Sequence, residues 1–437
     1  MRLLASVLDQ TGCANVWRRR FMVVVLELML MAPGKATFRN LSRYSGYHEK
    51  TFSRGFGRDY DWVGLNREAI GQVIPPEHEQ ALVMDASFIG KSGRHTYGVD
   101  RFWNGTAARV EHGLEISLLG WLDISTGQAY SLSVEQTPAR ASLPTPTRTK
   151  GHSKGHSKSH SKSHSKSHSK SQAPTPAVYE ESRLMGYVSQ LRRVVDTHQL
   201  QYLKYLIVDG YYSKVPFIDA VVDLGLQPIG KLRADANMRY LYRGPKRAGR
   251  GAPKRFDGKV QWSDLSRFTR SDTEQAGIVL YQQSLNHRQF KRTLNTVVVV
   301  DTRGKTPRQA ILFSTDLTLS ALTLYRYYKA RFHVEFLFRD AKQATGLGDC
   351  QARDKAKVHF HVNASLSAAS FAKLEAQQQA GGALTEPFSI HSLQRCAFNR
   401  HLLDRIIEHL ELGQTLHKFS PLYQTLCNYG TISQQAA

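Results

Sequence analysis

The chain has 437 residues, of which 41% are hydrophobic, so it is long enough for two or three domains with a real core. Its formal net charge of +23 falls to +16 (23 − 7) without the arginine and six lysines of residues 148–172, so the rest is also basic. Such a surface is typical of proteins that bind nucleic acid or anionic membranes, and a basic protein without such a partner is the alternative. The cysteines form no CxxC pair, which excludes a cysteine zinc site and fits free thiols in a reducing cytoplasm: Cys13, Cys350, Cys396 and Cys427.

The first 75 residues or so are predicted to be helical, and Val73–Gln80 then forms a linker. The apolar run Phe21–Ala32 is too short to span a bilayer, and Glu27 interrupts it. No small-residue cleavage site follows the run, so we expect a buried helix rather than a signal peptide or a membrane anchor.

Within this region, Ala36–Phe56 has the pattern of a helix–turn–helix, with Gly46 in the turn. The second helix would present polar and basic side chains to a DNA groove. These are His48, Lys50, Ser53 and Arg54. A plain helical hairpin with a glycine turn fits the same pattern.

From Gln80 the pattern becomes that of strands. One apolar strand is predicted to end at Asp85, and two antiparallel strands are predicted within Leu114–Thr137, joined by a turn at Ser125–Gly127. Asp85 would therefore emerge at the rim of a sheet.

A tetrapeptide repeat of His, Ser and Lys, with Gly in its first units, occupies Gly151–Lys170 and contains no apolar residue. It cannot contribute to a core, so we expect a disordered basic spacer over about residues 140–177. Its lysines would attract phosphate backbones without sequence preference. The alternative is a weak metal site formed by its five histidines.

Strand–helix–strand order follows the repeat. A helix near Glu180–His198 precedes an apolar strand that ends at Asp209, then a helix over about Val215–Leu224 and a strand over Leu226–Arg233. This order predicts that part of the sheet is parallel.

Residues 234–300 are predicted to form a β-rich insertion with a basic loop at Tyr242–Lys259. The first part of a catalytic core would then occupy residues 80–233 and its end residues 301–370. A helical C-terminal region would occupy residues 371–437.

A long helix is predicted to begin near Thr318 and to continue to Gly346. Four of its residues fall at relative positions 0, 3, 7 and 14, and therefore at roughly 0°, 300°, 340° and 320° around the helix axis. They are Tyr328, Arg331, Glu335 and Lys342. One carboxylate beside two cations and a phenol suits a metal ion next to phosphates. The alternative is a solvated face with the ion pairs Arg331–Glu335 and Glu335–Arg339.

A lone carboxylate makes a weak Mg²⁺ site, so Glu335 needs partners. Asp85 and Asp209 are the best candidates because each follows an apolar strand. Three other acids are rivals of Asp85: Asp100, Glu115 and Asp123. Three carboxylates could hold two Mg²⁺ ions, one activating a water or hydroxyl and one stabilising the leaving oxygen at phosphorus.

The spacing Tyr328-x₂-Arg331-x₃-Glu335-x₆-Lys342 resembles the signature of insertion-sequence-4 type DDE transposases. The segments "VMDASFIGKSG" and "LIVDGYYSK" are similar to that family's two Asp-bearing strands, and the resemblance spans Leu82–Leu366. It implies an α/β fold: a ribonuclease-H-like mixed sheet flanked by helices, with a β-strand insertion between the second Asp and the Glu and helical regions at both ends. By the same resemblance, Arg331 and Lys342 contact end phosphates and Tyr328 helps to position them.

The resemblance further implies the activity. The protein would bind the terminal inverted repeats of its element, cleave DNA at the ends and join the 3′-hydroxyls to target DNA. The expected cofactor is Mg²⁺, with Mn²⁺ as a substitute, and Asp85, Asp209 and Glu335 would be its ligands and the catalytic triad.

We expect a homodimer on DNA in a bacterial cytoplasm, associated with the nucleoid. The alternatives are a nuclease of the same fold and a domesticated, inactive DNA-binding protein, and the repeat is a departure from the family.

Overall fold

The computed structural model describes residues 2–10, 15–140, 176–245, 252–381, 388–410 and 420–432. The repeat at Gly151–Lys170, Cys13 and residues 246–251 of the basic loop lie outside these ranges, so the predictions for them stay predictions.

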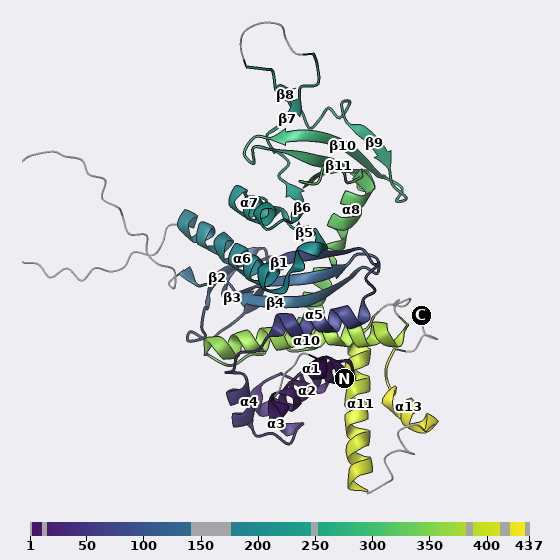
Figure 1. Ribbon diagram of the computed structural model, residues 1–437. Helices are drawn as coiled ribbons and strands as arrows, with labels where there is room; N and C mark the ends of the chain where they lie inside the picture. The colour runs from purple at the N-terminus through teal and green to yellow at the C-terminus, as the bar shows by residue number, and fades with distance from the viewer. Residues whose placement is uncertain are drawn as a thin grey trace, which may run out of the picture.

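The described residues form one 12-stranded sheet, and five of its strands have the strand order of a ribonuclease-H-like fold and form the centre of the molecule (Figure 1). β4, β3 and β1 are antiparallel, and β1, β5 and β6 are parallel, which confirms the predicted mixed sheet. The strands are β1 (Gln80–Gly90), β3 (Arg109–Asp123), β4 (Gln128–Gln136), β5 (Tyr205–Val208) and β6 (Gln227–Leu232), and β2 (Asp100–Asn104) pairs with the start of β3. Gly127, with a φ of 65°, closes the β3–β4 turn where the sequence predicts it.

The strands of the insertion extend this sheet at one end. β12 pairs with β6, and the rest continue outward, as the upper part of Figure 1 shows. They are β7 (Met238–Leu241), β8 (Phe256–Lys259), β9 (Thr269–Asp272), β10 (Ile278–His287), β11 (Arg292–Asp301) and β12 (Arg308–Ser314). The β-strand insertion between Asp209 and Glu335 is thereby confirmed.

Helices cover both faces of the sheet, which is why β1 reads as a continuous apolar run. Leu82 and Met84 join one hydrophobic cluster, and Val83 joins the other, because successive side chains of a strand point to opposite faces. α6 (Pro176–His198) and α7 (Val215–Asp223) cover the first face, and α8 (Ala321–Ala330) and α9 (His333–Gln343) cover the second. Two short 3₁₀ turns flank β5: η2 (Leu200–Leu203) and η3 (Gly210–Tyr212).

The helical N-terminal region shares its core with the sheet. Its helices are α1 (Arg2–Gln10), α2 (Val16–Met31), α3 (Phe38–Arg43), α4 (Glu49–Gly55) and α5 (Trp62–Val73). α2 contains the apolar run Phe21–Met31 and is largely buried, as the sequence predicts. Phe56 packs on Phe360 of α10 (Lys355–Gln379) with ring centroids 4.4 Å apart. The N-terminal helices are therefore part of the main hydrophobic cluster rather than a unit that could be removed.

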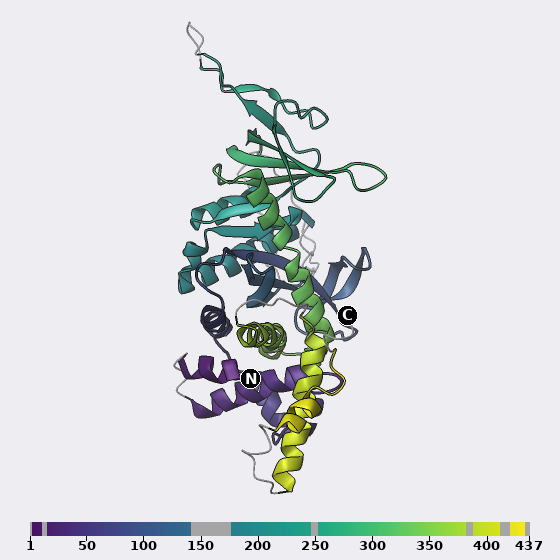
Figure 2. The ribbon, with the colours of Figure 1, turned by 90° about the vertical axis from the view of Figure 1, so that its right-hand side faces the viewer.

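α10 lies between the sheet and the N-terminal helices, and both α5 and α2 pack on it (Figure 2). α11 (Ile390–His409) extends away from α10, and α13 (Pro421–Cys427) packs against it. These helices form the predicted helical C-terminal region. In the ranges given above, no helix is both long and apolar enough to cross a bilayer.

Candidate active site

Asp85 and Asp209 lie side by side where the parallel pairing of two strands ends. Met84 of β1 is the register partner of Val208 of β5, and each aspartate is the next residue of its chain. Met84 and Val208 belong to the cluster under α6 and α7. Because side chains alternate along a strand, both aspartates are placed toward the opposite face, which α8 and α9 cover. The structure thus brings the two candidate aspartates to neighbouring positions of the sheet.

The prediction that the first strand ends at Asp85 is wrong. β1 continues to Gly90 because it keeps pairing with β3, from Gln80–Asp123 to Gly90–Gly113. Only its parallel pairing with β5 ends at Met84. Asp85 therefore lies inside β1, at the position where the neighbouring strand β5 ends.

The prediction of one continuous helix is also wrong. α8 ends at Ala330 and α9 begins at His333. Between them the amides of Arg331, Phe332, Val334 and Glu335 bond to carbonyls three residues earlier, which is the tighter 3₁₀ pattern. Tyr328 thus lies on α8, Arg331 in the break, and Glu335 and Lys342 on α9.

Arg331 connects two of the three carboxylates. Its Nη1 donates to Asp85 Oδ2 at 2.9 Å, and its Nη2 donates to Glu335 Oε1 at 2.9 Å. The side chains of Arg331 and Asp85 are only 16% and 15% exposed, whereas that of Glu335 is 46% exposed. The ion pair of Arg331 with Glu335 is one of the two i, i+4 pairs expected for a solvated helix face. The second expected partner of Glu335, Arg339, instead pairs with Asp340.

Burial raises the pKa of Asp85 to about 6, Arg331 opposes this rise, and the charges of Asp209 and Glu335 add to it. The charges of both other carboxylates therefore act on Asp85. Burial also raises the pKa of Tyr328, against which Arg331 acts.

Asp209 is held by the short turn that follows it. Its Oδ1 accepts from the amide of Tyr211 at 2.8 Å, and the Tyr211 hydroxyl donates to Glu180 of α6 at 2.9 Å. Arg183 of α6 and Lys214 both lie over the Tyr211 ring.

The three rivals of Asp85 have other roles. Glu115 is buried and accepts from Arg183, Tyr187 and Thr137. Asp123 is buried and holds the β3–β4 turn through Thr126 and His78. Asp100 accepts from backbone amides of Arg101 and Arg140. None of the three pairs with Arg331 in the described residues.

The donor set fits a divalent metal ion. Carboxylate oxygens are the ligands that Mg²⁺ and Mn²⁺ prefer, and Asp85 and Asp209 supply them from the sheet and Glu335 from α9. Arg331 already places a positive charge between two of these groups, which shows that they favour a cation. Among the described residues, no three His, Cys, Asp or Glu side chains lie close enough together to be a metal site as they stand.

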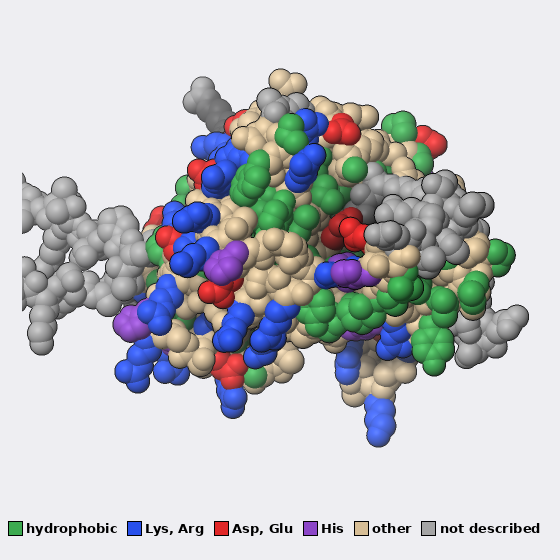
Figure 3. Space-filling model, turned by 90° about the horizontal axis from the view of Figure 1, so that it is seen from below, with side chains coloured by type: hydrophobic (Ala, Val, Ile, Leu, Met, Phe, Trp, Pro, Cys, Tyr) green, Lys and Arg blue, Asp and Glu red, His purple; other side chains and the backbone are tan. Residues whose placement is uncertain are grey.

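The predicted DNA-contacting residues of the N-terminal region lie on α4. Leu41 is buried and Gly46 is in the turn between α3 and α4, while Lys50 and Arg54 are exposed. Exposed Lys and Arg side chains gather on the side of the molecule where α3 and α4 lie (Figure 3). This set consists of Lys35, Arg39, Arg43, Lys50, Arg54 and Arg58.

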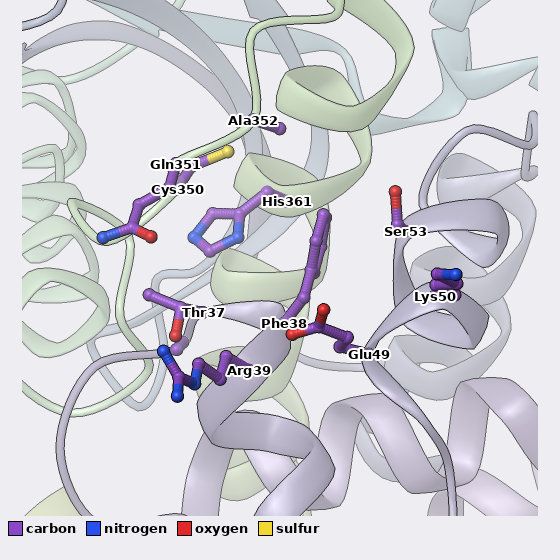
Figure 4. Close-up of a pocket in the computed structure, with 11 residues that line it drawn as sticks. Thr37, Phe38, Arg39, Glu49, Lys50, Ser53, Cys350, Gln351, Ala352 and His361 are labelled. Carbon is purple, nitrogen blue, oxygen red and sulfur yellow. The ribbon is translucent and has the colours of Figure 1, made fainter.

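A cleft of about 430 Å³ separates α3 and α4 from the loop that follows α9. Lys50 and Ser53 line one wall and Cys350 and Gln351 line another, with His361 at the back (Figure 4). Lys91 fixes this loop by donating to the carbonyls of Gly348 and Cys350, each at 2.8 Å. A ligand of α4 would therefore lie against the loop attached to the Glu335 helix.

The family model described as "DDE superfamily endonuclease" matches residues 12–286, which is more than half of the chain. The chain belongs to the DDE endonuclease superfamily. The match includes Asp85 and Asp209 and ends before α8. A comparison with curated proteins finds no match. Members of this superfamily act on DNA and generally use divalent metal ions. This DDE endonuclease is therefore a protein of nuclease or transposase type.

The contact between Arg331 and Asp85 spans 246 positions of the sequence, so helix spacing cannot predict it. The aspartate that ends each of the continuous apolar runs "ALVMD" and "YLIVD" is the only part of this contact that the sequence marks. The alternation of side chains along β1 and β5 places both aspartates on one sheet face, and a helix bearing a cation covers that face.

Proposed function

We propose that this DDE endonuclease is a transposase of the insertion-sequence-4 type, which binds the inverted repeats of its element, cleaves at the ends and joins the 3′-hydroxyls to target DNA. The observation that carries the proposal is the placement of Asp85 beside Asp209 on paired strands, with Arg331 bonded to both Asp85 and Glu335. The Tyr–Arg–Glu–Lys spacing supports the type, and the basic surface over α3 and α4 supports DNA binding.

In this proposal the three carboxylates hold divalent metal ions, preferably Mg²⁺, with Mn²⁺ as a substitute. When bound, such ions supply an activated water or hydroxyl and stabilise the leaving oxygen at phosphorus. Asp85 contributes from a buried strand and Asp209 from a turn fixed by Tyr211, so both ligands are held rigidly. Glu335 is more exposed than Asp85 and faces solvent, where DNA would arrive.

The cations around the site have a different role. Lys342 is exposed on the same helix as Glu335 and makes no ion pair in the described part of the chain, so it is available to a phosphate. Lys50 and Arg54 of α4 would contact the repeat at a distance from the chemistry. The loop 346–352, which α4 faces across the cleft, would bring the bound DNA toward α9.

A dimer on DNA is part of the proposal, because two ends must be brought together before joining. A location in the bacterial cytoplasm, in association with the nucleoid, is also part of the proposal. Two other functions fit the same site: a nuclease that does not join strands, and a DNA-binding protein without activity.

The test uses the full-length protein, Mg²⁺ and DNA carrying the inverted repeats that flank its gene. Strand-transfer product supports the transposase, cleavage without joining supports the nuclease, and a gel shift without chemistry supports the DNA-binding protein. Failure to bind DNA would contradict all three.

A further inference from the structure

The guanidinium of Arg331 bonds to both Asp85 and Glu335. It must move away from them if these two carboxylates are to hold a metal ion. Both of its Nη atoms donate to these carboxylates at 2.9 Å, and the side chain of one partner, Asp85, is only 15% exposed. A divalent cation on the same oxygens would lie next to the guanidinium, and like charges at such distances repel strongly. The two cations therefore compete for one set of oxygens.

The backbone around Arg331 allows its side chain to move without unfolding a helix. Arg331 is the C-terminal cap of α8, and α9 begins two residues later. The 3₁₀ hydrogen bonds in this break involve backbone groups only, so they do not depend on where the guanidinium lies. A break of this kind inside a helix often marks a functional hinge.

A released guanidinium would have a second partner close by. Glu335 is half exposed, and Lys342 lies on the same helix, so a DNA strand at the site would bring phosphates within reach of Arg331. Arginine binds carboxylate and phosphate with the same planar fork of donors, so an exchange between them conserves its hydrogen bonds.

We propose that Arg331 is a positioning residue that holds Asp85 and Glu335 together in the metal-free protein and transfers to a DNA phosphate when a divalent ion binds these carboxylates. Metal binding and DNA binding would thereby be coupled through one side chain. The inference rests on the proposed function, since it requires a metal-binding, DNA-binding site.

The first experiment measures Mn²⁺ binding by isothermal titration calorimetry without DNA. The Arg331→Ala variant should bind Mn²⁺ at least about tenfold more tightly than the wild type, because the competing charge is gone. Arg331→Lys keeps the charge and loses the planar fork. It should also bind Mn²⁺ more tightly than the wild type, whereas a simple charge effect predicts wild-type affinity for this variant.

The second experiment measures the salt dependence of binding to a fluorescein-labelled duplex of the flanking sequence, with Ca²⁺ and with EDTA. In the wild type, Ca²⁺ should make the slope of log affinity against log salt steeper, because Arg331 then neutralises one additional phosphate. In Arg331→Ala the same addition of Ca²⁺ should change the slope by about one unit less. A residue that only stabilises the fold would not produce this difference. Arg326→Ala is the matched control, since Arg326 lies on α8 and pairs with Glu79, away from the three carboxylates.

Thermal melting first establishes that each variant is folded, and Arg331→Lys carries the test if Arg331→Ala is not. Equal effects of Ca²⁺ on the slopes of the wild type and the folded Arg331 variant, or equal Mn²⁺ affinities for the wild type and Arg331→Lys, would overturn the transfer of Arg331 while leaving the proposed function intact. A wild-type protein that bound neither Mn²⁺ nor DNA would overturn both.

Discussion

Asp85 and Asp209 lie at the same level of the sheet, one position after the register pair Met84–Val208 of two parallel strands. The register of β1 and β5 thus places two carboxylates next to each other. Glu335 then joins them from α9, and Arg331 connects it to Asp85.

Replacing either aspartate by asparagine should reduce metal-dependent DNA cleavage by at least about 100-fold, or about 2.7 kcal/mol in the barrier. An amide of the same shape cannot supply the negative charge that holds the ions. DNA affinity measured in EDTA should remain close to that of the wild type. Cleavage assays and gel shifts on Asp85→Asn and Asp209→Asn check both expectations.

Asp100→Asn is the matched control, because Asp100 is a rival in the sequence that lies outside the site and bonds to backbone amides. Normal cleavage by Asp85→Asn together with loss of cleavage by Asp100→Asn would show that the wrong aspartate is assigned to the site.

Removing the positive charge of Lys342 or Lys50 should weaken DNA binding and reduce the salt slope by about one unit for each phosphate that the variant no longer neutralises. Lys342→Ala should also lower cleavage, since Lys342 lies on the helix of Glu335, whereas Lys50→Ala should affect binding alone. Fluorescence anisotropy at several salt concentrations measures the slopes. Wild-type slopes in both variants would contradict the assignment of these lysines to DNA.

The alternation of apolar residues predicts much of the fold. The β3–β4 hairpin and the parallel pair of β5 and β6 lie where the sequence indicates them, because buried strands and turn residues leave strong local signals. The shared face of Asp85 and Asp209 follows from the same period of two.

What the sequence does not predict is set by contacts between distant segments. β1 passes beyond Asp85 because β3 continues to pair with it, and apolar content alone cannot show this. The break at Arg331 contains neither glycine nor proline, so no local signal marks it. The contact of Arg331 with Asp85 depends on how α8 docks on the sheet, which helix spacing does not determine.

The shared core of the N-terminal helices leads to a prediction on stability. Phe56 is fully buried, and its ring lies 4.9 Å from that of Phe38 and 4.4 Å from that of Phe360. Phe56→Ala should lower the free energy of unfolding of the whole protein by about 3–5 kcal/mol. Phe332→Ala is the control, since Phe332 is half exposed and its loss should change stability by less than about 0.5 kcal/mol.

Urea melts measure both values, and a single transition is expected in each variant. A second transition that appeared only in Phe56→Ala would show that the N-terminal helices unfold independently of the sheet. Deletion of residues 1–75 is a poor test of DNA recognition for the same reason, because it would expose the core that α2, α5 and α10 share.

The stability of the protein should depend on pH through His361, which is buried at the back of the cleft beside α4. Its Nε2 donates to the Gly346 carbonyl at 2.8 Å, and burial lowers its pKa from 6.5 to about 4. Between these values the unfolded chain takes up a proton that the folded protein does not, so stability is lost as the pH falls through this window. The full difference is about 3 kcal/mol.

A glutamine at position 361 separates the titration of the ring from its hydrogen bond. His361→Gln keeps a donor for the carbonyl but does not titrate, so its urea-unfolding free energy should fall less steeply than that of the wild type between about pH 7 and 4. His95→Gln, at an exposed position, should retain the wild-type dependence. Parallel curves for the wild type and His361→Gln would show that His361 does not contribute to the acid sensitivity of the fold.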